Sequence, residues 1–292
     1  MPDPESPLQD SPAPPKPAVA KKWLVAILVL AFAFVLMPFL LWYMTTFSRP
    51  LTDAGLASYF SDKEHPRRAQ HALSQVADRI LSPNPALRDS AKTWYPEVVK
   101  LSAEGSDEIR VTAAWVMGQD NQSPEFHAAL VRLLSDSNPM VARNAALSLV
   151  RFGDPAGHDL IASMLAPYTM TAPRAGALSV RLKPGDVVTP GTLVAQILGG
   201  AGKSDVRSQV PGTIQKWVEA NGSALRAGQP LLLLDPSSDM AWESLRALYL
   251  VGRADDLPKV ENYARGAPGM PPPMQQQAEL TLQAISSRAS KQ

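Results

Sequence analysis

The stretch PEFHAALVRLLSDSNPMVARNAALSLVRFGD, residues 124–154, decides the fold of most of this chain. A proline in its first position suits the start of a helix, and the apolar residues that follow recur at helical spacing. Ser137, Asn138 and Pro139 interrupt that spacing, and a second run of helical spacing ends near Gly153. The stretch therefore predicts two helices joined by a tight turn.

The pattern of this second helix recurs elsewhere in the chain. Three segments superimpose: 67–76 (RRAQHALSQV), 109–118 (IRVTAAWVMG) and 141–150 (VARNAALSLV). Their small residues Ala72, Ala114 and Ala146 lie 42 and 32 residues apart and would let neighbouring helices approach closely. The pairs resemble HEAT repeats, which imply a stacked solenoid with a long surface for protein partners. An irregular helical domain is the alternative.

The composition changes at residue 171, where valine, glycine and proline become frequent. Two stretches, 172–198 (APRAGALSVRLKPGDVVTPGTLVAQIL) and 210–236 (VPGTIQKWVEANGSALRAGQPLLLLDP), share three glycines in register. The matched pairs are Gly176 with Gly212, Gly185 with Gly222, and Gly191 with Gly228. Each half reads as short strands separated by tight turns, so we expect a duplicated β structure.

This duplicated region resembles the biotinyl/lipoyl domain, a flattened barrel that also occurs in the periplasmic adaptors of efflux systems. In the cofactor carriers a modified lysine sits on the hairpin between the halves, and the matching position here is Ala201. The neighbouring Lys203 is displaced by two residues, so it is only a weak candidate for lipoyl or biotin attachment. The efflux adaptors usually insert a long coiled-coil hairpin, whereas residues 199–205 form a short connection here.

Helical spacing returns after residue 236, and we expect the C-terminal helices to continue the first array. The fold class predicted is α+β, with a HEAT-like solenoid interrupted by a small barrel-sandwich domain. The predicted boundaries are 1–22 for a disordered proline-rich tail, 23–43 for a transmembrane helix, 51–170 for helical repeats, 171–236 for the barrel, 237–288 for further helices and 289–292 for a tail.

The segment 23–43 (WLVAILVLAFAFVLMPFLLWY) contains no charged residue and would span about 32 Å as a helix, the thickness of a bilayer core. Trp23, Trp42 and Tyr43 suit the two interfacial belts. A cleaved signal peptide is the alternative, but no small-residue cleavage site follows. Lys21 and Lys22 predict a cytoplasmic N-terminus in a bacterial inner membrane, with the C-terminal domain periplasmic or extracellular.

Composition restricts the classes of function. The net charge is +1 and the chain has no cysteine and four histidines, none of them at metal-ligand spacing. Nucleic-acid binding, thiol chemistry and a zinc site are therefore not expected, and neither are a cofactor or a catalytic residue. Asp107, Asp120, Asp136 and Asp154 stand at helix ends, where capping explains them.

The function predicted is that of a non-catalytic, membrane-anchored adaptor or scaffold for protein partners, probed first at exposed aromatic and arginine side chains. An atypical efflux-type adaptor is the alternative, and a biotin or lipoyl carrier is a third hypothesis. The partners expected are integral-membrane subunits of a complex. The candidate interface residues are Trp94, Trp217, Arg181 and Arg226.

Overall fold

The computed structural model describes residues 20–46, 50–199, 202–267 and 269–290. The chain divides into two compact units, residues 1–52 and residues 53–292, which are described separately. The described part of the first unit contains α1 (Ala20–Thr46), whose side chains between Val25 and Leu40 are exposed. Within the described ranges, no helix combines the length and apolar character needed to cross a membrane. Trp23 is exposed, while the side chains of Trp42 and Tyr43 lie outside the description.

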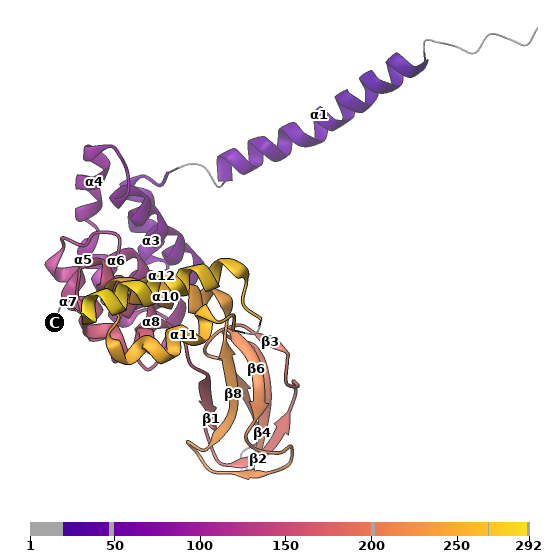
Figure 1. Cartoon of the computed structure of the whole chain (residues 1–292). Coiled ribbons are helices and arrows are strands. Elements are labelled where there is room, and N and C mark those ends of the chain that lie inside the picture. Colours follow the sequence, from indigo (N-terminus) through magenta and orange to yellow (C-terminus); the bar gives the residue numbers. More distant parts are fainter. Residues whose placement is uncertain (1–19, 47–49, 200–201, 268, 291–292) are drawn as a thin grey trace, which may run out of the picture. The chain divides into compact units, whose positions relative to one another are not determined.

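The second unit is α+β, as predicted: helices, then two four-stranded antiparallel sheets, then helices again (Figure 1). Most helices begin at a proline in the first turn, where the missing N–H costs no hydrogen bond. The helices before the sheets are α2 (Asp53–Ser61), α3 (Pro66–Ile80), α4 (Pro85–Lys92), α5 (Tyr95–Glu104), α6 (Asp107–Met117), α7 (Pro124–Leu133), α8 (Pro139–Arg151) and α9 (His158–Ser163). Those after them are α10 (Ser238–Val251), α11 (Leu257–Ala264) and α12 (Pro272–Ala289).

The helices form two layers built from successive pairs. In each pair, α5–α6, α7–α8, α9–α10 and α11–α12, the two helices contact each other. The second helices of the pairs also contact one another in the order α6, α8, α10, α12. We call α6, α8, α10 and α12 the second-helix layer. Both sheets lie in the chain between α9 and α10, so they occupy the turn of one helix pair.

The helices on the two sides of this insertion share one core. Val150 of α8 and Ile161 of α9 belong to the same buried cluster as Leu248 of α10 and Ile285 of α12. Hydroxyl groups link the helices within it: Ser244 donates to the carbonyl of Ile161 at 2.7 Å, and Thr281 to that of Leu245 at 2.9 Å. The C-terminal helices are therefore part of the same packed array as the helices that precede the sheets.

The two sheets are built from the same strand pattern. One has the order β1-β8-β6-β3 and the other β5-β4-β2-β7, with all paired strands antiparallel. Exchanging the two sequence halves, so that β2 replaces β6 and β4 replaces β8, converts one order into the other. The strands are β1 (Tyr168–Thr171), β2 (Gly176–Val180), β3 (Val187–Val188), β4 (Leu193–Gly199), β5 (Gly202–Arg207), β6 (Gly212–Trp217), β7 (Ala224–Leu225) and β8 (Pro230–Pro236).

Hydrogen bonds between the halves repeat in the same way. The Gly185 N–H donates to the carbonyl of Ile214 at 2.8 Å. Its counterpart, the Gly222 N–H, donates to Leu178 at 2.7 Å. Both glycines have a positive φ, near +90°, a conformation that disfavours any side chain. A second matched pair of hydrogen bonds is 2.8 Å long in both halves: the Gly191 N–H donates to the carbonyl of Ser208, and the Gly228 N–H donates to that of Ala172.

The β region begins earlier than predicted. Residues up to 170 were expected to be helical, but Tyr168–Thr171 forms β1 and pairs with β8. Pro167 ends the preceding helical run, and the buried side chain of Met170 joins the core between the sheets. Four residues with one buried side chain are too few to show strand alternation in the sequence, which explains the misplaced boundary.

Helix α8 contacts the β region through one arginine and one methionine. Arg143 is 6% exposed, and its guanidinium carbon lies 5.4 Å from the centre of the Tyr168 ring in β1. Burial lowers the pKa of Arg143, and within the described residues no carboxylate pairs with it. Met140, one turn earlier, packs against the core of the sheets. A buried cation on an aromatic face and a thioether in the sheet core therefore hold this end of the β region on the array.

The matched glycines allow a direct stability test. A Cβ on Gly212 would touch the backbone carbonyl of Asp235, whereas one on Gly222 would meet nothing within 4 Å. We expect Gly212→Ala to lower the free energy of unfolding by about 2–4 kcal/mol, because backbone must move. Gly222→Ala should lower the free energy of unfolding by only about 1 kcal/mol, because the only penalty is an alanine at positive φ. Urea denaturation followed by circular dichroism measures both, and equal losses would contradict the described packing.

Candidate protein-docking surface

A hollow lined by both apolar and polar side chains lies across the second-helix layer. An open groove of about 510 Å³ is lined by residues of α6, α8 and α10, among them Trp115, Leu147 and Leu250. A second hollow, between α10 and α12, again includes Leu250 and adds Tyr249 and Leu280. We call these five residues, Trp115, Leu147, Tyr249, Leu250 and Leu280, the Leu250 surface. Since two hollows share Leu250, they form one continuous surface over the second helices.

The side chains of this surface are unusually exposed for their type. Leu250 is 60% exposed, and Trp115, Tyr249 and Leu280 are each about 44–46% exposed. Clustered large apolar side chains on the surface of a folded protein mark places where another molecule binds. Tryptophan and tyrosine also supply a large share of the binding energy in protein interfaces. The geometry thus favours the docking of a protein segment across α6, α8, α10 and α12.

The sequence carries a signal for this surface that the initial prediction missed. In α10, Asp239, Glu243 and Arg246 occupy the exposed stripe at helical spacing, and Leu250 is the next position of that stripe. An apolar residue on the polar face of an amphipathic helix indicates an interface. In α6, Trp115 likewise follows Glu108 and Thr112 on the less buried stripe.

The same kind of polar contact recurs at the turns between successive helix pairs. A side chain near the start of a first helix meets an aspartate that follows the second helix of the same pair. Three such contacts each measure 2.7 Å: Tyr95 Oη to Asp120, His127 Nε2 to Asp154, and His158 Nε2 to the buried Asp256. Burial and Asp120 raise the pKa of Tyr95 well above its usual range. Each of these aspartates thus joins the two helices of its pair at the turn.

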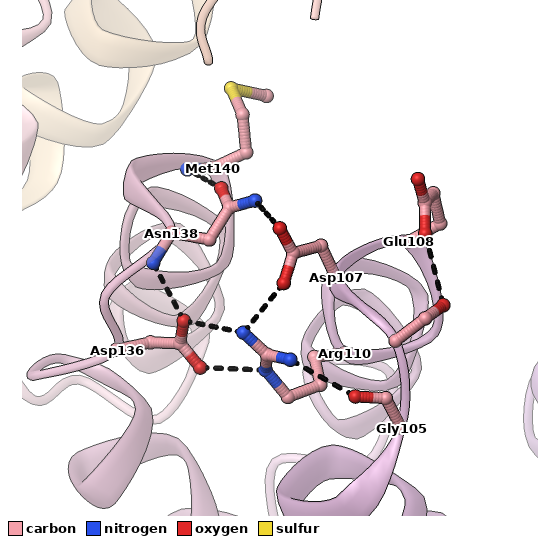
Figure 2. A network of polar contacts seen from close by, with 8 residues as sticks. Gly105, Asp107, Glu108, Arg110, Asp136, Asn138 and Met140 are labelled. Carbon is pink, nitrogen blue, oxygen red and sulfur yellow. Dashed lines mark hydrogen bonds and ion pairs between the residues drawn. The ribbon is translucent and has the colours of Figure 1, made fainter. Parts of the chain in front are cut away.

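Asp107 and Asp136, two further aspartates predicted to cap helix ends, belong to the network around Arg110 in Figure 2. Arg110 Nε and Nη2 donate to the two carboxylate oxygens of Asp136, at 2.8 and 2.9 Å, and Nη2 also reaches Asp107 at 2.9 Å. Asn138 completes the ring: its Nδ2 donates to Asp107 at 2.7 Å, and its backbone N–H donates to Asp136 at 2.8 Å. The network joins α6 to the turn before α8. In the described part of the chain, no group of acidic and histidine side chains could hold a metal ion.

The two tryptophans predicted at an interface also make contacts within the fold. Trp94 is half-buried, packs against Phe60 with 5.5 Å between ring centres, and points its Nε1 at Asp53, 3.4 Å away. Trp217 packs on the core of the sheets, and its Nε1 donates to the carbonyl of Leu182 at 3.1 Å. Trp115 was not among the predicted interface residues, because its apolar neighbours Ala114 and Val116 are typical of a buried position.

The two arginines predicted at an interface lie on the β region, and neither lines the hollows of the Leu250 surface. Both are exposed: Arg181 donates to Gln196 at 2.7 Å, and Arg226 borders a shallow hollow beside Gly228. Lys203 is also exposed and faces Leu198 across β4 and β5. The position matched to the modified lysine of cofactor carriers, Ala201, lies outside the described residues.

Comparison with known proteins agrees with the helical part of this description. Residues 95–169 match the family model of HEAT repeats. A search of curated proteins gives no match. Among solved structures, a single-chain, multi-domain long-chain acyl-CoA carboxylase matches at 16% identity and a TM-score of 0.23. The match covers 43% of this chain and only 13% of that much longer chain, so it transfers neither fold nor activity.

The Arg110 network predicts a pH-dependent stability. Arg110 lowers the pKa of Asp136 below the ordinary 3.8, so ionised Asp136 stabilises the fold at neutral pH. That contribution is complete above pH 3.8 and is lost as the pH falls through the lower folded-state pKa. We expect Asp136→Asn to cost about 1–3 kcal/mol at pH 7 and progressively less below pH 4.

Denaturation of the variant and the parent chain at a series of pH values measures this difference. Asp89→Asn is the matched control, because the Lys92–Asp89 pair is exposed and should contribute little. A stability loss in Asp136→Asn that stayed constant down to pH 2 would contradict an ionised Asp136.

Proposed function

We propose that this chain is a non-catalytic, membrane-anchored adaptor that binds a protein partner across its second-helix layer. HEAT repeats suggest protein–protein interaction, and the match to them covers the helices that carry Trp115 and Leu147. The observation that carries the proposal is the Leu250 surface, where exposed apolar side chains of α6, α10 and α12 lie beside the half-buried Leu147 of α8. The proposed membrane anchor is the segment 23–43, and the uncharged apolar sequence of that segment is its support.

In this proposal the β region is a second binding region, attached to the helical array. Its repeated strand order and matched hydrogen bonds favour a barrel of the biotinyl/lipoyl type. The chain carries no lysine at the position matched to the modified residue, so we propose a barrel without a cofactor. Intact mass of the purified chain tests this directly: the sequence mass supports it, and extra mass on Lys203 would replace it with a carrier function.

The docking proposal predicts which substitutions release the partner. The tagged full-length chain is purified from its native membranes in mild detergent, and bound proteins are quantified by mass spectrometry. We expect Trp115→Ala combined with Leu250→Ala to reduce the stoichiometric partner at least tenfold, since two anchors of a docked segment are removed. Leu87→Ala, an exposed leucine on α4, is the control and should retain the partner. Full retention by the double variant would refute docking at this surface.

The anchor has a test of its own. We expect the full-length chain to stay with membranes during alkaline carbonate extraction, because integral helices resist it and peripheral proteins do not. Deleting residues 20–46 should release the rest of the chain. The absence of native cysteine allows Ser290→Cys to be labelled with a membrane-impermeant maleimide, and labelling of intact spheroplasts would place the C-terminal domain outside the cytoplasm. Complete extraction of the full-length chain by carbonate would refute the anchor.

A further inference from the structure

Arginines surround the Leu250 surface. The hollows that border Leu250 are lined by four arginines and by one carboxylate, Glu243. The four arginines are Arg151 at the end of α8, Arg246 on α10, Arg253 just after α10, and Arg288 in the last turn of α12. This excess of positive charge is local, because the chain as a whole has a net charge of +1.

Among the described contacts, Arg151 and Arg288 bond only to neutral groups. Arg151 donates to the neutral amide of Gln119 at 2.8 Å, and Arg288 donates to the backbone carbonyls of Leu248, Tyr249 and Gly252. Arg246 meets Glu243 at 3.4 Å, and both side chains are about half exposed, which makes this a weak pair.

Arg253 is exposed at the same edge and acts electrostatically on Asp159, on the neighbouring α9. Arg253 and Asp159 do not form an ion pair; Asp159 pairs with His158. The rim of the docking surface therefore carries four arginines against Glu243 and the nearby Asp159, which leaves an excess of positive charge around the apolar side chains.

Resting on the docking function proposed above, we propose that the partner segment is acidic: a stretch of protein in which carboxylates flank one or more large apolar side chains. The apolar side chains contact Trp115 and Leu250, and the carboxylates face Arg151 and Arg246 across the groove. Charge of opposite sign speeds association and disfavours wrong partners, while the buried apolar anchors supply most of the affinity. A nucleic-acid strand would match the rim and leave the apolar centre uncovered, so a peptide fits better.

Site-specific crosslinking in the full-length chain tests the chemistry of this segment. Leu250→p-benzoylphenylalanine places a photoreactive group at the centre of the surface, and irradiation in native membranes is followed by peptide mapping. We expect the crosslinked peptide to contain an apolar anchor and more aspartate and glutamate than lysine and arginine. Adding Arg151→Glu and Arg246→Glu should reduce the crosslinking yield about tenfold, since two attractive contacts become repulsive.

The matched control is Arg132→Glu, a charge reversal on the exposed face of α7 in the other helix layer, which should leave the yield unchanged. A neutral or basic peptide, a lipid, a nucleic acid, or the chain's own residues 1–19 at position 250 would overturn the acidic-partner proposal. Co-purification that depends on Trp115 and Leu250 but tolerates both arginine reversals would also overturn it, while leaving the docking function intact. The absence of both co-purified partner and crosslink would refute the two proposals together.

Discussion

The packing of α9 against α10 is the contact on which the rest of the fold depends, because the whole β region lies between them in the chain. A helix pair of a repeat array cannot bury its apolar face alone and is stable only between its neighbours. Here the pair closes despite the insertion, through the shared core of Ile161 and Leu248 and the hydrogen bond from Ser244 to Ile161. If this contact opened, the array would be divided into two short pieces, each with an exposed apolar face.

The β region meets this constraint because its first and last strands are partners. β1 pairs with β8, with Tyr168 opposite Leu234, so the chain enters and leaves the sheets side by side. Insertions whose ends lie close together disturb the host fold least. Arg143 and Met140 then hold that end of the sheets on α8. The buried cation is costly unless its aromatic partner stays in place, which links the orientation of the sheets to that of α8.

Sequence reasoning succeeded where a local pattern has one structural meaning. Glycines repeated in register, such as Gly185 and Gly222, indicated the duplicated strands because few other residues adopt their φ. The helix–turn–helix of residues 124–154 was equally clear. It failed where the exposure of a side chain depends on tertiary contacts: Trp115 stands in the apolar stretch VTAAWVMG, yet its ring is exposed. The start of β1 was missed because its pairing partner lies more than sixty residues away.

The Leu250 surface is formed by helices from both sides of the inserted sheets. Its residues come from α6 and α8, before the sheets, and from α10 and α12, after them. In the proposed docking mode, a partner bound across the groove would contact both sides of the insertion and would stabilise the closed array by an amount that grows with the partner's concentration. Arg143 lies on α8, the same helix that contributes Leu147 to the groove. In the proposed docking mode, one helix, α8, would therefore contact both the partner and the sheets.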